Sequence, residues 1–436
     1  MNRFQFVELT HMVKSKVILS WRMFVYATPF LMHLLAISCT SLSPEEWPGW
    51  GGTTGDFKVP SVKLSNSWNN EGPPEIWSRE LGEGYSGILV DDSKAYTMYR
   101  KAESEVVIAM DKKTGSTKWE FIYPATIDKK RDNTDKKYGL GPQSTPVLTK
   151  SSIVSIGWTG KMYCLRKDNG KVIWQHDLTQ KYNATAMSRG YSSSPISYQN
   201  LIIALVGGTQ HALMAFHQET GEVVWSKHNF KRSHSSPILI NVNGSDQLVG
   251  LMDDEVVGVN PLTGDLLWQH THGLAGGLTV STPSWGKDNI LVISTAYKGG
   301  TRALKLIKNN GETSVKQLWF NKRMRIHHGN MIRLDNLVYS SSGDFGPAFF
   351  TALQVSTGDV LWKDRSFAKA TFLYADKKFI VLDENGTLAL VKVSEDGPTI
   401  LAKAQILEEN CWTIPSLVKT TLYLRSRNKI RVIDLG

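Results

Sequence analysis

The stretch DKKTGSTKW, from Asp111 to Trp119, returns along the chain with little variation. In every copy a glycine stands four residues before the tryptophan, and an apolar run precedes the glycine. Recurrence at intervals of about 40 to 55 residues indicates a repeat fold in which each unit packs against its neighbours. The other copies are KDNGKVIW ending at Trp174, QETGEVVW at Trp225, PLTGDLLW at Trp268 and VSTGDVLW at Trp362.

One unit can be followed almost completely, from Lys369 to Leu407. It holds four short apolar runs, KATFLYAD, FIVLD, TLALVKV and TILAKAQIL, separated by turns that include Asn385-Gly386. Asn-Gly between such runs is a strong signal for a tight hairpin. Four short antiparallel strands within about 40 residues predict one blade of a β-propeller.

The number of units follows from the tryptophans and from the C-terminus. The run 429–436 is an apolar strand with no further strand after it, and PPEIWSREL around Trp77 can supply the missing one. We therefore predict an all-β, eight-bladed propeller of four-stranded antiparallel blades, closed by pairing of the N-terminal strand near Trp77 with the C-terminal blade, with seven blades as the alternative. The tryptophans expected to hold blades together are Trp77, Trp119, Trp174, Trp225, Trp268, Trp319 and Trp362.

The N-terminus is typical of an export signal. Lys14, Lys16 and Arg22 precede the apolar run 23–37, which is short for a membrane span. The run ends in LAISC, which resembles a bacterial lipobox, so we expect Cys39 to be acylated after cleavage. An ordinary cleaved signal or a short anchor is the alternative. The predicted segments are a lipoprotein-type signal peptide at 1–38, a tether at 39–74 and the propeller at 75–436.

The composition, with 41% hydrophobic and 21% charged residues, is typical of a globular protein with a buried core. The net charge of +10 lies partly in the predicted signal, and the run 128–137 mixes both signs, so we expect no nucleic-acid partner. Cys164 is predicted to be a small buried hydrophobe, and a disulfide with Cys411 stays open. His327 and His328 should point to opposite faces of a strand, and no metal site is predicted.

Units built from an apolar strand, a polar residue, Thr-Gly and a tryptophan resemble the repeats of pyrroloquinoline-quinone (PQQ)-type propellers. The resemblance covers Trp77 to Gly436. One branch of this family, the quinoprotein dehydrogenases, implies a PQQ stacked between a tryptophan and a disulfide of adjacent cysteines, a Ca²⁺ held by Glu and Asn, and an Asp as base. This chain has no adjacent cysteines, and the calcium ligands and the base cannot be placed on it. The other branch, the non-enzymatic propeller lipoprotein of the outer-membrane β-barrel assembly machinery, is more similar in length and anchor.

A polar turn that ends in proline precedes the first strand of many units, as in QSTP at Pro146 and SSSP at Pro195. Because the first strand of a propeller blade is innermost, these turns should converge on one mouth of the central channel. The residues three positions before the proline, with their neighbours, combine aromatics, histidines and cations, which suits a partner's peptide or a small polar ligand. The alternative is that they only fill the channel and hydrogen-bond one another. The candidate binding residues are Tyr85, Gln143, Arg189, Tyr191, His234, His328, Lys369 and Trp412.

Three functions follow from these patterns. The favoured one is a non-catalytic, monomeric lipoprotein, exported and lipid-anchored at the periplasmic face of the bacterial envelope, at the outer rather than the inner membrane. Its propeller would bind other envelope proteins or a small polar ligand, without a cofactor or a catalytic residue. The first alternative is a PQQ-dependent oxidoreductase that uses PQQ and Ca²⁺ on alcohols or sugars. The second is a carbohydrate-binding or sensing propeller.

Overall fold

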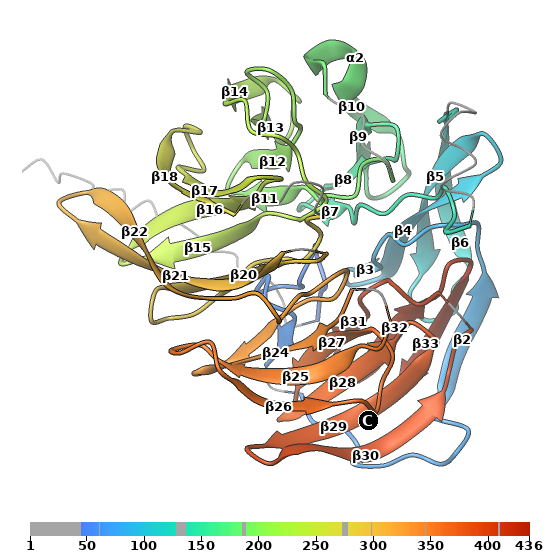
Figure 1. Cartoon of the computed structure of the whole chain (residues 1–436). Coiled ribbons are helices and arrows are strands. Elements are labelled where there is room, and N and C mark those ends of the chain that lie inside the picture. The colour runs from blue at the N-terminus through green and yellow to red at the C-terminus, as the bar shows by residue number, and fades with distance from the viewer. Residues whose placement is uncertain are drawn as a thin grey trace, which may run out of the picture. The chain divides into compact units, whose positions relative to one another are not determined.

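The computed structural model describes residues 45–60, 62–127, 137–184, 189–272, 278–297, 299–344, 346–408 and 410–436. These residues belong to one compact unit, Leu42–Gly436. They form eight sheets around a common centre, together with the five-residue helix α2 (Leu178–Tyr182) (Figure 1). The predicted eight-bladed, all-β propeller is confirmed, and the seven-bladed alternative is excluded. The predicted signal peptide and Cys39 lie outside the described residues, among which no helix could span a bilayer.

Each blade is a four-stranded antiparallel sheet whose first strand is innermost. Blade 1 contains β3 (Leu89–Val90), β4 (Lys94–Lys101), β5 (Ser104–Asp111) and β6 (Thr117–Pro124), and blade 2 contains β7 (Val147–Leu148), β8 (Ser152–Ile156), β9 (Lys161–Arg166) and β10 (Val172–Asp177). Blade 3 contains β11 (Ile196–Tyr198), β12 (Leu201–Leu205), β13 (Leu213–His217) and β14 (Val223–Lys227), and blade 4 contains β15 (Ile238–Val242), β16 (Ser245–Leu251), β17 (Glu255–Val259) and β18 (Leu266–Thr271).

The second half of the ring repeats this order. Blade 5 contains β19 (Ser284–Trp285), β20 (Ile290–Thr295), β21 (Gly300–Asn309) and β22 (Glu312–Asn321), and blade 6 contains β23 (Ile332–Leu334), β24 (Leu337–Ser342), β25 (Phe349–Gln354) and β26 (Val360–Asp364). Blade 7 contains β27 (Ala370–Ala375), β28 (Lys378–Asp383), β29 (Thr387–Ser394) and β30 (Gly397–Gln405). Blade 8 contains β31 (Ser416–Val418), β32 (Thr421–Arg425), β33 (Lys429–Asp434) and, as its outer strand, β2 (Glu75–Glu80).

Blade 8 closes the ring, because its strands come from both ends of the folded unit. β2 pairs antiparallel with β33, with Trp77 opposite Val432 and Glu80 opposite Lys429. The predicted closure through Trp77 is therefore confirmed. Without β2, the last sheet would have three strands and an open edge, which invites pairing with another chain.

Hydrophobic side chains fill the spaces between blades. The middle strands are buried on both faces, as in β5, where every residue from Val106 to Met110 is inaccessible to solvent. Because both faces of such a strand are buried, its sequence is apolar throughout instead of alternating between apolar and polar residues. The outer strands alternate instead, as in β6, where Trp119 and Tyr123 are buried between exposed residues.

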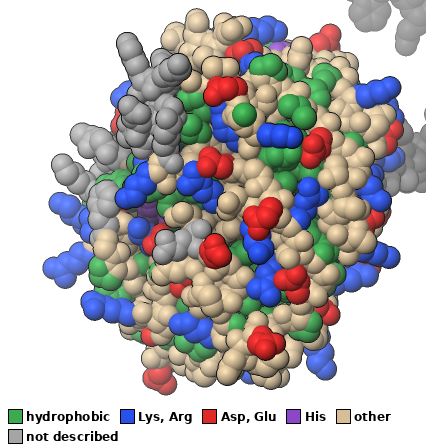
Figure 2. Space-filling view, turned by 90° about the vertical axis from the view of Figure 1, so that its right-hand side faces the viewer, with side chains coloured by type: hydrophobic (Ala, Val, Ile, Leu, Met, Phe, Trp, Pro, Cys, Tyr) green, Lys and Arg blue, Asp and Glu red, His purple; other side chains and the backbone are tan. Residues whose placement is uncertain are grey.

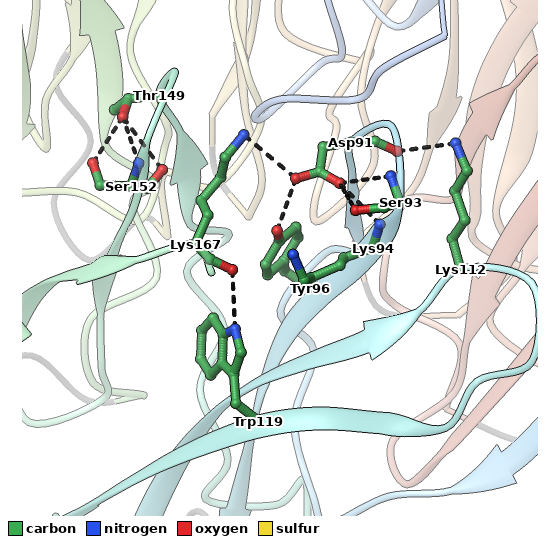
Figure 3. Close-up of polar contacts among 9 residues, drawn as sticks. All are labelled: Asp91, Ser93, Lys94, Tyr96, Lys112, Trp119, Thr149, Ser152 and Lys167. Carbon is green, nitrogen blue, oxygen red and sulfur yellow. Dashed lines mark hydrogen bonds and ion pairs between the residues drawn. The ribbon is translucent and has the colours of Figure 1, made fainter. Parts of the chain in front are cut away.

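The outer-strand tryptophans join each blade to the next. Trp119 of β6 donates its indole N–H to the carbonyl oxygen of Lys167, 3.0 Å away (Figure 3). The ring covers Gly170, whose φ is +72° and where a Cβ would lie 2.6 Å from the ring, so only glycine permits the contact. Equivalent bonds join Trp77 to Lys112, Trp174 to Gln218, Trp225 to Pro261, Trp319 to Val355 and Trp362 to Ser394.

Trp268 uses a different acceptor, because the following blade replaces the short Thr-Gly turn by the long hairpin of β21 and β22. Its indole N–H donates to Gln247 Oε1 at 2.7 Å. Gln247 Nε2 in turn donates to Thr313 Oγ1 of β22 at 2.8 Å. The buried Gln247 therefore links blades 4 and 5, because its side chain takes the place of the turn carbonyl that accepts the indole N–H in the other joints.

Asp91 reinforces the joint between blades 1 and 2 (Figure 3). Its carboxylate accepts hydrogen bonds from Tyr96 Oη at 2.8 Å and from the backbone N–H groups of Ser93 and Lys94, and it lies 3.3 Å from Lys167 Nζ. Burial alone would raise the pKa of Asp91, but these hydrogen bonds and the lysine outweigh it and lower the pKa. The carboxylate therefore stays charged inside the joint.

Part of the predicted tether enters the centre of the ring, where Figure 1 shows it in dark blue. We call residues 46–60 the strap. Its strand β1 (Lys58–Val59) pairs in parallel with the inner strand β27, so the sheet of blade 7 has five strands. Trp47 forms an antiparallel bridge with Val90 of β3. The strap therefore contacts inner strands of separate blades, an arrangement without a counterpart in the repeat pattern.

The tryptophan–glycine joint predicts unequal effects for two glycine substitutions. Gly264 and Gly244 both have positive φ, +72° and +83°. A Cβ on Gly264 would lie 2.5 Å from Trp225, whereas a Cβ on Gly244 meets no described atom within 4 Å. We expect Gly244→Ala to lower the free energy of unfolding by about 1 kcal/mol through backbone strain alone. Gly264→Ala should lower it by about 2 kcal/mol more. Urea denaturation followed by tryptophan fluorescence measures both, and equal losses would contradict the joint.

Candidate functional site

The central channel has two distinct ends. At the upper mouth the inner strands begin, after the polar turns that the sequence singles out. At the lower mouth the inner strands finish, for example at Val90 of β3 and Ala375 of β27. The turns that hold the Gly–Trp phrase also lie on the lower side, because the third strand of a blade runs parallel to the first.

Aromatic rings gather at the upper mouth around Trp412. The ring centroid of Trp412 lies 5.1 Å from that of Tyr85, 5.4 Å from His328 and 5.7 Å from Tyr138. The hydroxyl of Tyr85 donates to the carbonyl oxygen of Tyr138 at 2.6 Å, and burial raises the pKa of Tyr85 to about 12. Blades 1, 6 and 8 and the loop before β7 thus contribute to one aromatic group.

The two adjacent histidines face each other in this group. Nδ1 of His327 lies 3.1 Å from Nδ1 of His328, and Nε2 of His327 lies 2.8 Å from the hydroxyl of Tyr297. The expectation that the pair points to opposite faces of a strand is wrong, because both residues lie in a bend before β23. Burial, with Lys369 nearby, lowers the pKa of His327 to about 4. Burial, with His327 and Lys369 nearby, also lowers the pKa of His328, so both rings are neutral at pH 7.

Charged side chains surround the rings in compensating pairs. Lys369 Nζ lies 4.0 Å from Glu384 Oε1, and Glu384 Oε2 accepts the indole N–H of Trp412 at 3.1 Å. Arg325 forms an ion pair of 2.7 Å with Asp344, whose side chain is 7% exposed. Acidic groups on blades 6 and 7 therefore balance two of the cations at the mouth.

A second group of residues comes from the segments before the inner strands of blades 3 and 4. Ser192 Oγ and His234 Nδ1 lie 2.5 Å apart, and burial together with Arg232 and Arg189 lowers the pKa of His234 to about 4. Arg189 has φ of +71°, unusual for a residue other than glycine, and its guanidinium lies 4.3 Å from the ring centre of Tyr138. That contact connects the second group to the aromatic one. Among the described residues, none hydrogen-bonds the shielded Nε2 of His234 or that of His328.

Two of the candidate binding residues, Tyr191 and Gln143, lie outside these two groups. Tyr191 is 2% exposed and packs between blades 2 and 3, where its hydroxyl donates to the carbonyl oxygen of Val206 at 2.5 Å. The guanidinium of Arg232 lies 3.6 Å from its ring centre. Gln143 is half-buried in the turn before β7. The structure thus brings Tyr85, Arg189, His234, His328, Lys369 and Trp412 to the mouth and places Tyr191 beneath it.

In three of the polar turns, the last hydroxyl links neighbouring blades. The N–H of Gly87 donates to Thr145 Oγ1 at 2.9 Å, Thr145 N–H to Ser194 Oγ at 3.0 Å, and Ser194 N–H to Ser236 Oγ at 3.0 Å. These three turns therefore join blades through the residue directly before the proline.

Four residues of the mouth carry no repeat signal. Tyr138 and Tyr297 belong to connections between strands, Asp344 to the segment SSGDFGP, and Glu384 to the hairpin turn Glu-Asn-Gly. Glu384 lies in the turn that the sequence predicts at Asn385-Gly386, and Asp344 lies two residues after the end of β24. Their side chains could have been assigned to the mouth only by aligning the turns of all blades on one side of the ring.

The residues at the upper mouth do not fit PQQ. Trp412, the tryptophan available there, already packs against three rings, which leaves no open platform for a quinone. Cys164 and Cys411 are both free and buried, in blades 2 and 8, so no disulfide can cover a ligand. Within the described ranges, no three His, Cys, Asp or Glu residues are grouped to hold a metal ion. The alternative of a Cys164–Cys411 disulfide is excluded.

Charge on the outer surface is mixed. On the face drawn in Figure 2, Lys and Arg side chains alternate with Asp and Glu, without a large area of one sign. Several exposed charges of the described residues are paired, such as Arg166 with Asp168 and Lys118 with Asp111. On this face the mixed charges form no basic patch of the kind that contacts nucleic acid.

Comparison with known proteins gives one family match and several structural ones. A PQQ-type family model described as outer membrane protein assembly factor BamB matches residues 66–241 and 102–364, which together cover more than half of the chain. The structure of BamB from Moraxella catarrhalis is 15% identical, with a TM-score of 0.59, and covers 82% of this chain and 96% of that one. Quinohemoprotein alcohol dehydrogenase from Comamonas testosteroni is 12% identical, with a TM-score of 0.66, over 91% of this chain and 82% of that one.

A second quinohemoprotein alcohol dehydrogenase, from Pseudomonas putida HK5, is 12% identical with a TM-score of 0.64, over 90% of this chain and 81% of that one. At such identities these likenesses show the fold alone. No curated protein matches the sequence.

The lowered pKa of His234 predicts a loss of stability in acid. The folded-state pKa of about 4 lies below the ordinary 6.5, so protons bind the unfolded chain first. The contribution of His234 is complete above pH 6.5 and is lost as pH falls towards 4. Between about pH 7.5 and about pH 5 we expect a loss of about 2 kcal/mol from this residue.

The measurement is the free energy of unfolding against pH. His234→Asn should flatten the dependence, since it removes the titrating ring and keeps a polar group beside Ser192. Ser192→Ala is the matched control, because it deletes the hydrogen bond and keeps the imidazole, so its slope should stay steep. Identical slopes in the wild type and in His234→Asn would contradict the assignment.

Proposed function

Because the chain belongs to the PQQ-type propeller family described as outer membrane protein assembly factor BamB, we propose that it is a non-catalytic, protein-binding lipoprotein of the bacterial envelope. The family match is the observation that carries this proposal. It agrees with the resemblance seen in the repeats. In this proposal the protein is exported, monomeric and anchored through Cys39 at the periplasmic face of the outer membrane.

The chemistry of the upper mouth supports a binding role. Trp412 is half-buried and offers the exposed part of its ring, and Arg189 offers positive charge beside Tyr138. The shielded Nε2 of His234 could form one further hydrogen bond, which a bound group would supply. A polar or acidic segment of an envelope protein matches this combination of groups. A site of this kind uses side chains to recognise a partner and needs no cofactor.

Capture of partners from the native envelope tests this site. We expect the double variant His234→Ala, His328→Ala to lose bound envelope proteins severalfold after crosslinking, because it removes two rings from the mouth. The matched control His217→Ala, His270→Ala changes the same number of histidines, on β13 and β18, and should retain them. Equal capture by both variants would exclude the upper mouth as the binding site.

The structural likeness to quinohemoprotein alcohol dehydrogenases makes a quinoprotein the second candidate. The packing around Trp412 disfavours it. We expect no quinone absorbance and no dye-linked oxidation of alcohols or sugars after PQQ and Ca²⁺ are added to the purified protein. Turnover under these conditions would replace the binding proposal by PQQ-dependent catalysis. Retention of a sugar without turnover would favour the carbohydrate-binding alternative.

A further inference from the structure

The strap closes the lower mouth of the channel. The N–H of Trp47 donates to the carbonyl oxygen of Val90 at 2.8 Å, and the N–H of Leu148 donates to the carbonyl oxygen of Pro48 at 2.7 Å. Val90 and Leu148 are the last residues of the inner strands β3 and β7. On its way out the strap pairs with Tyr374 and Ala375, which end the inner strand β27. These contacts attach it to blades 1, 2 and 7 at the same end of the channel.

The middle of the strap reaches further into the channel. The indole N–H of Trp50 donates to Thr282 Oγ1 of blade 5 at 2.8 Å, and its ring packs edge-on against Phe57 at 5.6 Å. Trp47 and Phe57 are 5% and 3% exposed, so the strap is part of the hydrophobic core. The loop between them is compact because Gly52 has φ of +78° and lies against the ring of Trp47, where a Cβ would come within 2.8 Å.

The chain enters the folded unit at the lower mouth. Glu45, directly before the strap, forms an ion pair of 2.7 Å with Lys419, which lies in the turn between β31 and β32 on the lower side. Only residues 40–44 separate Cys39 from this point. Such a spacer spans at most about 20 Å when fully extended. Most of the predicted 39–74 tether is therefore unavailable as a flexible linker.

The spacer is short compared with the propeller, so its length limits which face can reach the membrane. A folded unit of 395 residues, Leu42–Gly436, has a radius of gyration of about 21 Å. A spacer of about 20 Å that starts at the centre of one face cannot pass around the rim to the opposite face. If the apolar run 23–37 were itself the anchor, the spacer would be residues 38–44, and the same limit would hold.

We propose that the lower face of the propeller docks against the lipid bilayer and that the strap fixes this orientation, so that the upper mouth points away from the membrane. This inference rests on the proposed membrane anchor. Several charges near the entry point are paired, as in Lys419 with Glu45, Lys58 with Asp56 and Lys167 with Asp91. The short spacer is sufficient to set the orientation without attraction to anionic lipids.

Two probes on one strand test the orientation. Glu103 precedes β5 on the upper side and Lys113 follows it on the lower side, and both are exposed. They are separated by a strand of about 27 Å. Each is replaced by cysteine (Glu103→Cys or Lys113→Cys) in the full-length lipidated protein, labelled with a fluorophore and reconstituted in phosphatidylethanolamine and phosphatidylglycerol vesicles with nitroxide-labelled lipids. The native Cys164 and Cys411 are buried, and the unsubstituted protein gives the labelling background.

We expect the probe at position 113 to be quenched severalfold more strongly than the probe at position 103. Insertion of about 30 Gly and Ser residues between Ser43 and Pro44 adds a flexible coil of about 30 Å and should remove the difference. Flotation of the vesicles is measured in the same samples, with Cys39→Ser as the unanchored control. Equal quenching in protein that floats would overturn the orientation and leave the anchor intact. If the wild-type protein does not float, the anchor of the proposed function fails, and the orientation fails with it.

Discussion

The contact of a tryptophan with the glycine turn of the next blade is the constraint on which the ring depends. A single blade is covered with apolar side chains on both faces of its middle strands, so it has no stable form alone, and stability comes from neighbouring pairs. Each buried indole contributes about 3 kcal/mol by its area, and its N–H bond about 1 kcal/mol more. A protein of this kind has a net stability of about 5–15 kcal/mol, so a few such joints decide whether the ring closes.

The joints also divide the propeller into a lower side, where one geometry is repeated from blade to blade, and an upper side, where the connections differ between blades. The tryptophan, its glycine and the Asp91 network all lie on the lower side, where one turn type recurs. On the upper side, connections of different length and composition bring Tyr138, Asp344 and Glu384 into a single group. Loops at the end of a rigid scaffold are where binding residues usually lie. The joints occupy the lower side, which leaves the upper side for the binding site that we propose.

The repeated pattern made the fold predictable from sequence. Features that lie outside this pattern could not be predicted. The interval between tryptophans predicted the blades, and the unfinished strand 429–436 predicted closure through Trp77, because both follow from one periodic pattern. The strap escaped prediction because Trp50 meets Thr282, far away in sequence, and nothing local marks that contact. At the upper mouth, alignment of the polar turns found His234, His328 and Trp412. It could not show that Tyr191 turns inward to Val206 or that His327 and His328 lie in a bend.

The strap and the aromatic group both fill the central channel of the ring. A ring of eight blades leaves an axial channel, and an empty channel would deprive its lining of contacts at a cost that grows with its volume. Inner strands as short as β3 and β7 cannot fill that space with their own side chains. Here Trp47, Trp50 and Phe57 fill the lower part, and rings around Trp412 fill the upper part. Because the N-terminal segment fills the channel, few residues are left as a linker, so the same residues set the packing of the core and the distance to the proposed anchor.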